Sequence, residues 1–247
     1  MIDNPKIKTI ENLLLNKRVR LVQPKNGYRV AIDSVLLAAA VPARTGDKVV
    51  DLGCGACAVC ACIAKRVNGV ELIGVERDPI MADMARQNMS ANGFTGRIET
   101  NDLTNLPCTW ETGQIDHVVA NPPYMPANRA YLSPNTKRLT SCVEICASLA
   151  DWIIVAQRCL RNRGTITLIN RADRLNEILS TLNRGFGSIV VFPLFPKAGR
   201  DASRVLVQAV RSSRAPMRIT SGLLLHEANG HYTSKAEAIL RGAPINL

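Results

Sequence analysis

The sequence has few aromatic residues and no hydrophobic run long enough to cross a membrane. Phe, Trp and Tyr make up 4% of the 247 residues, too few for extensive stacking onto a long single strand of nucleic acid. The apolar stretches are short: residues 35–41, for example, have the length of one short helix, and charged residues interrupt the first twenty positions. Neither a membrane span nor a secretory signal is indicated, and we expect a cytoplasmic protein.

Histidine is also scarce. The chain has three His, and no second Cys pair or His cluster completes a ligand set around the crowded Cys54, Cys57, Cys60 and Cys62. These cysteines lie on a Gly-rich turn that enters a helix, where small residues are needed, and buried free Cys packs as a small hydrophobic residue. We therefore expect core packing rather than a metal site.

Charge is plentiful but uneven. The net charge is +11, with +5 in residues 1–50, −2 in residues 51–150 and +8 in residues 151–247. A basic excess on both sides of a neutral centre favours a polyanionic partner such as nucleic acid. A generally basic, well-solvated surface would give the same count, so charge alone does not identify the partner.

Strand-like and helix-like segments alternate from residue 48 onward. We expect strands at residues 48–52, 71–75, 97–100, 116–120, 165–169, 188–192 and 204–209. Because only a short loop (residues 196–201) joins the last two strands, this pair should be an antiparallel hairpin. The pattern predicts an α/β fold with a mostly parallel seven-stranded sheet that ends in an antiparallel hairpin and carries helices on both faces.

Helix boundaries are marked by local signals. Asp78 followed by Pro79 predicts a helix start, Asn92-Gly93 its end, and Ser141 with Glu144 forms a capping-box pattern ahead of a helix at residues 142–160. Further helices are expected at residues 34–41, 57–67 and 171–183, and after Ser234. We expect one domain, made of an N-terminal appendage with one helix (residues 1–45), a core (residues 46–210) and a loop-rich tail (residues 211–247).

The first motif that carries chemistry is a Gly-rich turn after the first core strand. Gly53 and Gly55 let the backbone approach a ligand where open α/β sheets bind cofactors, and Glu76 ends the second strand, where it could accept ribose hydroxyls. With Ala58 as a third small residue, this pattern suits NAD as well as S-adenosylmethionine. Asp51 ahead of the glycines favours S-adenosylmethionine, because a carboxylate would repel a phosphate and attract an ammonium group.

The second motif is Asn121-Pro122-Pro123-Tyr124, which directly follows the fourth strand. The prolines fix the backbone and remove donors, so carbonyls here can act as acceptors, and the Asn side chain adds another. The Tyr ring offers a flat face for stacking. Acceptors beside an aromatic plane predict a receptor for a planar NH₂ group, whereas two prolines in isolation would indicate an ordinary loop.

Together these motifs resemble the amino-methylating class of Rossmann-like methyltransferases, and within it the bacterial valine-tRNA adenine methyltransferase family, which modifies N6 of the adenine next to the anticodon. The likeness covers nearly the whole chain. It includes residues 23–24, 27–37, 51–55, 121–124 and 231–234, together with Glu76 and Asp102.

The resemblance implies roles for individual residues and S-adenosyl-L-methionine as the cofactor. Gly53 and Gly55 would line the donor beside Asp51 and Asn121, Glu76 would hold its ribose, and Asp102 would lie against its adenine. Arg29 and Asp33 would belong to a segment that covers the methionine end of the donor. Cys57 departs from the family pattern, which has a third Gly there, and its side chain is expected to crowd the methionine end.

Catalysis is expected to depend on positioning. The Asn121 side-chain oxygen and the Pro122 carbonyl would accept hydrogen bonds from the target amine, while Tyr124 would stack on a flipped base. No general base is required before transfer, because the nitrogen loses its proton readily only after alkylation. The RNA, in particular tRNA, would be held by phosphate contacts from both basic ends of the chain, including Lys197 and Arg200.

Three other functions compete. The same tetrapeptide serves N5 methylation of a glutamine in peptide release factors, although that family usually has a larger N-terminal helical domain than residues 1–45 would allow. An NAD-linked oxidoreductase would use Gly53 and Gly55 but leaves residues 121–124 unexplained. A non-catalytic RNA-binding protein would account for Cys57 but not for an intact Asn121.

Overall fold

The computed structural model describes residues 8–25, 32–126, 143–144 and 147–247. Two predictions fall outside this part of the chain, the donor contact of Arg29 and the helix cap at Ser141. Among the described helices none has both the length and the apolar character needed to cross a membrane.

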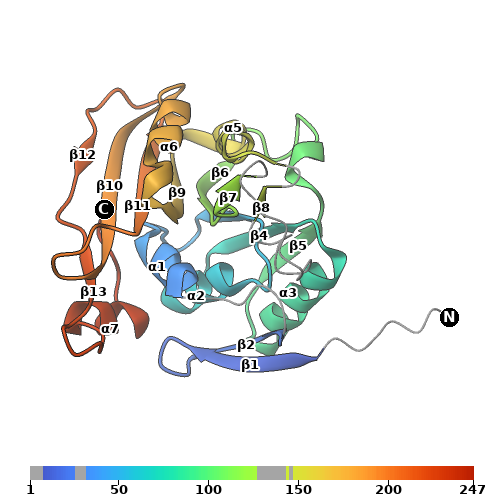
Figure 1. Ribbon diagram of the computed structural model, residues 1–247. Coiled ribbons are helices and arrows are strands. Elements are labelled where there is room, and N and C mark those ends of the chain that lie inside the picture. Colours follow the sequence, from blue (N-terminus) through green and yellow to red (C-terminus); the bar gives the residue numbers. More distant parts are fainter. Residues whose placement is uncertain (1–7, 26–31, 127–142, 145–146) are drawn as a thin grey trace.

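A single mixed sheet forms the centre of the molecule (Figure 1). Within the described residues it contains nine strands in the order β12-β10-β11-β9-β6-β3-β4-β5, with β13 also beside β10. The strands are β3 (Lys48–Leu52), β4 (Glu71–Glu76), β5 (Gly96–Thr100), β6 (Ile115–Ala120), β9 (Leu160–Arg171), β10 (Phe186–Lys197), β11 (Arg204–Arg211), β12 (Arg218–Ile219) and β13 (Leu223–His226). Strands β3, β4, β5, β6 and β9 are parallel, and β11 pairs antiparallel with both β9 and β10. The predicted parallel sheet with a terminal hairpin is confirmed.

The predicted number of seven strands is too small, because the tail adds two. Strands β12 and β13 both run parallel to β10 and lie along its outer edge. They have two and four residues, too few for alternation to be read from the sequence, and they form because β10 extends over twelve residues and offers them a long edge.

Helices cover both faces of the sheet, as predicted. One buried cluster joins Val49, Leu72 and Val119 to α1 (Ile32–Ala40), α2 (Ala58–Arg66), α3 (Pro79–Ala91) and α7 (Ser234–Leu240). The other joins the alternate strand residues Val50 and Ile73 to α5 (Leu149–Cys159), α6 (Leu175–Leu182) and two short 3₁₀ helices, η1 (Leu103–Asn105) and η3 (Ala172–Arg174). Side chains alternate between the two faces along each strand, so each face buries its own set.

The start of α3 confirms the sequence signal, whereas the start of α5 contradicts it. Asp78 caps α3 by accepting from the Ile80 amide, with Pro79 in its first turn. Helix α5 begins at Leu149, where Ser148 and Asp151 form a reciprocal capping box. Glu144 instead lies in β8 (Val143–Glu144), which pairs with β7 (Met125–Pro126). The same local pattern occurs twice within ten residues, and the buried side of α5 decides which copy starts the helix.

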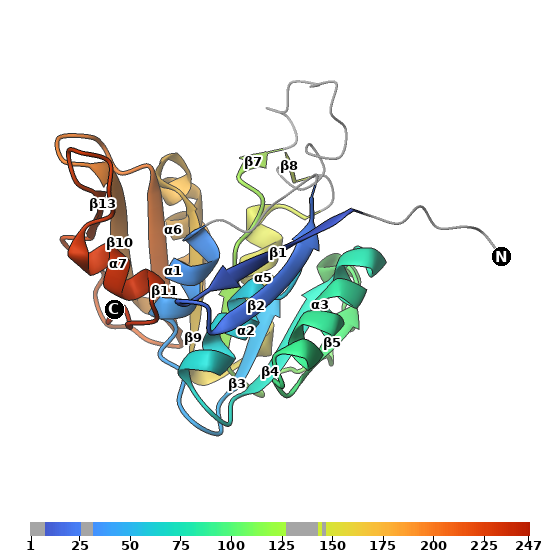
Figure 2. The same ribbon diagram turned by 90° about the horizontal axis from the view of Figure 1, so that it is seen from below.

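The N-terminal appendage contains a β-hairpin that the sequence analysis did not predict. Strands β1 (Thr9–Leu14) and β2 (Val19–Pro24) pair antiparallel and lie across α3 (Figure 2). Asn88 of α3, 1% exposed, donates to the Val22 carbonyl and accepts from the Val22 amide, each at 2.8 Å. Asn92 makes the equivalent pair with the Arg20 backbone. Two Asn side chains thus extend the hairpin's hydrogen bonding onto a helix.

Candidate active site

The motif residues converge at one edge of the sheet, where the parallel strands end. Leu52 of β3 lies opposite Val75 of β4 on one side and Ala120 of β6 on the other. The chain leaves β3 toward β4 and β5 and later returns to β6 on the opposite side, which makes this edge the topological switch point of the sheet. The Gly-rich turn, Glu76 and the Asn121–Tyr124 tetrapeptide are therefore neighbours at this edge.

The turn after β3 requires glycine for two different reasons. Gly53 has φ 64°, and a Cβ there would lie 2.4 Å from Cη2 of Trp152 on α5. Gly55 has φ 55°, but a Cβ there would meet no described atom within 4 Å. Gly53 thus lets the ring of Trp152 pack beneath the turn, while Gly55 leaves open space above it.

Cys57 takes the left-handed conformation that the family pattern gives to glycine. It has φ 70° and forms the N-cap of α2, yet its side chain is fully buried with those of Cys54 and Cys60. The thiol therefore packs into the core instead of into the open space above Gly55. The described residues contain no group of three potential ligands that could hold a metal ion, and burial raises the pKa of the nearby Cys62 to about 12.

Asp51 lies below the turn and is 1% exposed. Burial raises the pKa of its carboxyl to about 7, despite a contact of 3.6 Å from the Cys60 thiol, and the negative charge of Glu76 adds to the increase. The carboxyl therefore holds a proton to a higher pH than an exposed aspartate does. A cation arriving at the turn would favour its ionised form.

The backbone holds Glu76 at the end of β4. One carboxylate oxygen accepts from the Gly55 amide and the other from the Asp78 amide, both at 2.9 Å. Burial nevertheless raises the pKa of Glu76. Beyond β5, Asp102 caps η1 by accepting from the Thr104 amide at 2.9 Å. Two oriented carboxylates therefore follow two adjacent strands.

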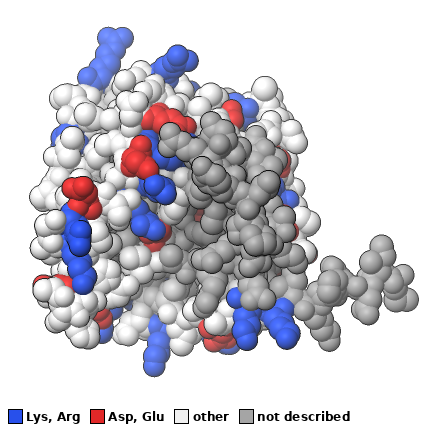
Figure 3. All heavy atoms as spheres, in the orientation of Figure 1, with Lys and Arg blue, Asp and Glu red and all other residues white. Residues whose placement is uncertain are grey.

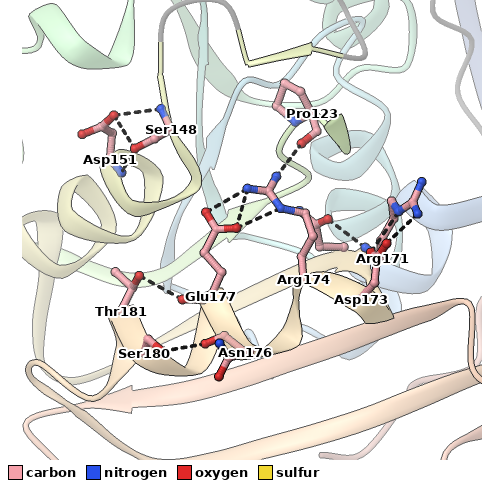
Figure 4. A network of polar contacts seen from close by, with 11 residues as sticks. Pro123, Ser148, Asp151, Arg171, Asp173, Arg174, Asn176, Glu177, Ser180 and Thr181 are labelled. Atoms are coloured by element: carbon pink, nitrogen blue, oxygen red, sulfur yellow. Dashed lines mark hydrogen bonds and ion pairs between the residues drawn. The ribbon is translucent and has the colours of Figure 1, made fainter. Parts of the chain in front are cut away.

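The prolines of the tetrapeptide differ in their surroundings. Pro122 is buried, and the Pro123 carbonyl accepts a hydrogen bond at 3.3 Å from Arg174 of η3 (Figure 4). Arg174 is 7% exposed, and Glu177 of α6 holds its guanidinium through both carboxylate oxygens. The Pro123 carbonyl is therefore engaged within the protein. The acceptors that the sequence analysis predicts for a target amine are different groups, the Asn121 side chain and the Pro122 carbonyl.

Tyr124 is held by residues from distant parts of the chain. Its hydroxyl donates to Asp33 of α1 at 2.6 Å, and the guanidinium of Arg204 lies 5.4 Å from the ring centroid. Tyr124 and Arg204 also line a cavity of about 360 Å³ with Arg171 and Asp173 at the end of β9 and with the turn that precedes β11. This cavity opens at the same sheet edge as the Gly-rich turn.

The predicted site residues therefore separate into groups. One group lies at the sheet edge around the Gly-rich turn: Gly53, Gly55, Glu76, Asp102 and the buried Asp51. Asp33 does not belong to this group, because it accepts a hydrogen bond from Tyr124. Lys197 and Arg200 are exposed on the turn between β10 and β11, which leads into the cavity. On the face shown in Figure 3, Lys and Arg side chains are dispersed among carboxylates rather than gathered in one patch.

Sequence reasoning missed Arg174 and Arg204. Each contacts the tetrapeptide from more than fifty positions away in the chain. Arg204 begins a strand and Arg174 ends a 3₁₀ turn, so neither belongs to a motif. Their only sequence signal is position, because both lie at chain reversals on the edge of the sheet that carries the site.

Characterised relatives match nearly the full length of this chain. A protein named tRNA1(Val) (adenine(37)-N6)-methyltransferase from Actinobacillus succinogenes is 26% identical over 221 residues, which is 88% of this chain and 90% of that protein. Its namesake from Porphyromonas gingivalis strain ATCC 33277 is also 26% identical, over 88% and 89% of the two chains.

Solved structures show the same fold. A predicted O-methyltransferase from Agrobacterium tumefaciens is 26% identical with a TM-score of 0.72, over 87% of this chain and 99% of that one. A 16S rRNA methyltransferase from T. thermophilus, solved with AdoMet and guanosine, has a TM-score of 0.58 at 20% identity, over 84% and 51%. The second likeness concerns the fold alone.

The family model described as "Methyltransferase small domain" matches residues 27–193, which contain the Gly-rich turn, Glu76 and the tetrapeptide. This match excludes the NAD-linked oxidoreductase. The chain belongs to the methyltransferase small domain family and is an S-adenosylmethionine-dependent methyltransferase.

Proposed function

We propose that the protein methylates the exocyclic N6 amine of an adenine in tRNA, the adenine next to the anticodon of valine tRNA. The observation that carries this proposal is the position of Asn121–Tyr124 directly after β6, beside the Gly-rich turn of β3. The relatives named for this reaction match this chain over nearly its whole length, which supports the choice of substrate.

The donor-side residues fit S-adenosylmethionine. A left-handed turn with open space above Gly55 admits a ligand close to the backbone, and Glu76 presents a fixed carboxylate suited to ribose hydroxyls. Asp51 supplies a buried carboxyl for the ammonium of the methionine part, and Asp102 lies after the neighbouring strand, where the adenine would extend. When bound, the donor supplies a methyl group on a positively charged sulfur.

The target-side residues position the amine. Asn121 Oδ1 and the Pro122 carbonyl would accept the two N–H groups of the exocyclic amine and favour a tetrahedral nitrogen with its lone pair directed at the methyl group. Tyr124 would stack on the base after it leaves the helical stack. The nitrogen gains the methyl and then releases one proton to water, so no side chain has to act as a base beforehand. Positioning of this kind contributes ~7–11 kcal/mol in favourable cases.

Mass spectrometry of nucleosides tests the proposal. Unmodified valine tRNA transcript is incubated with the protein and deuterium-labelled donor, then digested. We expect labelled N6-methyladenosine, and none from a matched transcript with guanine at the target position. Label on a release-factor glutamine instead of on RNA would establish the competing glutamine methylation. No transfer to either, with the donor bound, would indicate a non-catalytic protein.

A further inference from the structure

Three charged or aromatic side chains from distant segments meet at the wall of the cavity. Asp33 of α1, Tyr124 after β6 and Arg204 at the start of β11 are brought together by the fold. One oxygen of Asp33, Oδ2, accepts both from the Tyr124 hydroxyl at 2.6 Å and from Arg204 Nε at 2.8 Å. Arg204 also lies over the Tyr124 ring, with its Cζ 5.4 Å from the centroid. The Tyr124 ring is thus held at two points, its hydroxyl and one face.

The acceptor of this contact, Asp33, lies in the protein interior, whereas the Arg204 side chain is 36% exposed. Asp33 is 3% exposed, so its charge is balanced by Arg204 rather than by solvent. Hydrogen bonds that involve a charged partner are the stronger ones, and removing one partner of a buried pair leaves the other without compensation. The arrangement therefore selects one orientation of the Tyr124 ring over the rotamers that an exposed tyrosine would sample.

The location of the contact gives it a role. Tyr124 and Arg204 line the cavity of about 360 Å³, and Tyr124 follows Asn121 by three residues. A ring whose plane is fixed before the target arrives imposes that plane on whatever stacks against it. The ordering of the side chain is then complete in the free protein and does not weaken target binding.

We propose that Asp33 and Arg204 are positioning residues that fix the plane of Tyr124 and thereby select a planar, unpaired nucleobase. The proposal rests on the function proposed above. It assigns Asp33 to the target side of the site. The sequence analysis had instead predicted that Asp33 contacts the donor. Asp33 and Arg204 touch neither the base nor the donor in this scheme and act through Tyr124.

Three variants each remove one part of the contact. Tyr124→Phe removes the hydroxyl and keeps the ring, Asp33→Asn removes the charged acceptor, and Arg204→Gln removes the cation over the ring. Arg161→Gln is the matched control, since it removes a guanidinium that is ion-paired with Asp116 at the opposite end of β9, on the amino edge of the sheet.

Kinetics and donor binding separate the two assignments of Asp33. We expect Asp33→Asn and Arg204→Gln to raise KM for tRNA roughly tenfold, as for loss of one charge-assisted hydrogen bond, with the donor Kd from calorimetry unchanged. In a double-mutant cycle, the effects of Asp33→Asn and Tyr124→Phe should be less than additive, because both remove the hydrogen bond between the Tyr124 hydroxyl and Asp33. Asp33→Asn also weakens the contact with Arg204, so it should still add to Tyr124→Phe. Arg204→Lys, which retains the charge, should recover part of the loss. A weaker donor Kd with unchanged KM for tRNA would overturn the proposal.

A spectroscopic measurement decides the positioning independently of the substrate. In protein labelled with ¹³C at the tyrosine ring, the Tyr124 signal is identified by its loss in Tyr124→Phe. We expect this signal to shift or broaden in Asp33→Asn and Arg204→Gln and to stay in place in Arg161→Gln. An unchanged Tyr124 signal in the first two variants would overturn the proposal even if wild-type protein methylates tRNA. If Asp33→Asn fails to fold, Arg204→Gln carries the same test.

Discussion

The donor half and the target half of the site are built differently. In the donor half, Glu76 and Asp102 each follow their own strand and are oriented by backbone amides a few residues away or on the adjacent turn. In the target half, Tyr124 and Pro123 are held by side chains that come from α1, η3 and β11. The first half needs only the sheet edge, whereas the second needs the completed fold.

This difference predicts how each half responds to substitution. A donor-side change should act locally on donor affinity. A target-side change should alter transfer and target binding while leaving the donor in place, because the supporting residues lie on other elements. Variants that separate donor binding from transfer therefore test the division directly.

The largest expected effect follows from Asn121→Ala. Losing an acceptor that engages the amine chiefly in the transition state should lower kcat roughly 100-fold or more, as removal of one preorganised partner does in other enzymes. Donor Kd should stay within a few-fold of wild type, because the target amine is absent from the donor complex. Single-turnover methylation and calorimetry measure the two quantities.

Asn121→Asp sharpens this result. It keeps an acceptor of nearly the same shape and should retain more activity than the Ala variant. Circular dichroism is the control, since Asn121 follows a core strand. A folded Ala variant that methylates at near wild-type rate would show that the tetrapeptide has another role. A large loss of donor affinity in that variant would show that Asn121 also supports donor binding, so that the two halves are not separate.

A second prediction concerns Gly53, where the donor half does depend on a distant side chain. Gly53→Ala combines a left-handed residue, at ~1–2 kcal/mol, with an overpacked contact to Trp152, at ~1–3 kcal/mol. Gly55→Ala should show only the first cost. Urea unfolding measures both. Equal loss of unfolding free energy in the two variants would show that Trp152 can move aside. In that case, replacing the indole by a smaller ring with Trp152→Phe should not change the loss of unfolding free energy caused by Gly53→Ala.

A third prediction uses the buried carboxyl of Asp51. Its folded pKa of about 7 is above its ordinary value of 3.8, so it stabilises the fold fully at pH below that ordinary value, and this contribution is lost as pH rises toward and through 7. Binding of the ammonium-bearing donor should lower this pKa and release a fraction of a proton near pH 7. Calorimetry in two buffers of different ionisation enthalpy measures the release. The same release from Asp51→Asn would assign it to another group.

The smallest expected effect is on RNA affinity at Lys197 and Arg200. If both contact phosphates, changing them to Gln should make the log–log salt dependence of tRNA binding less steep by about 1.5, at about 0.7–0.9 per contact. Arg161→Gln, on the opposite edge of the sheet, should leave the slope unchanged. A slope that does not respond to the double change would place the phosphate contacts elsewhere on the dispersed basic surface.

Local signals made much of the fold predictable. Asp78 with Pro79 starts α3 because the cap is satisfied within two residues, and Asn92 ends it for the same reason. Most core strands could be recognised from an apolar run, and with them the edge where Gly53, Glu76 and Asn121 meet. Strand β5 is the exception, since Ile98 is its one apolar side chain. The arrangement of the residues in the proposed donor half was predictable because it follows from the strand ends; their contacts with the donor stay a prediction.

Contacts between distant segments explain what the sequence did not reveal. The β1–β2 hairpin depends on Asn88 and Asn92 of α3, whose amides could equally have faced solvent. The start of α5 depended on which of two similar capping patterns had an apolar face to bury. Arg204 gave no signal, because its role exists only once β11 places it over Tyr124.

The two edges of the sheet are protected in different ways from pairing with strands of other chains. The short β5 carries Arg97 and Glu99, charged residues that discourage a further strand. The long β10 is largely apolar, and β12 and β13 occupy much of its edge. A protein cut after Arg211 would uncover the edge of β10 that pairs with β12 and β13, along residues 190–197, and this edge would be a template for edge-to-edge aggregation. Selection for solubility would therefore maintain the tail even if it never touched a substrate.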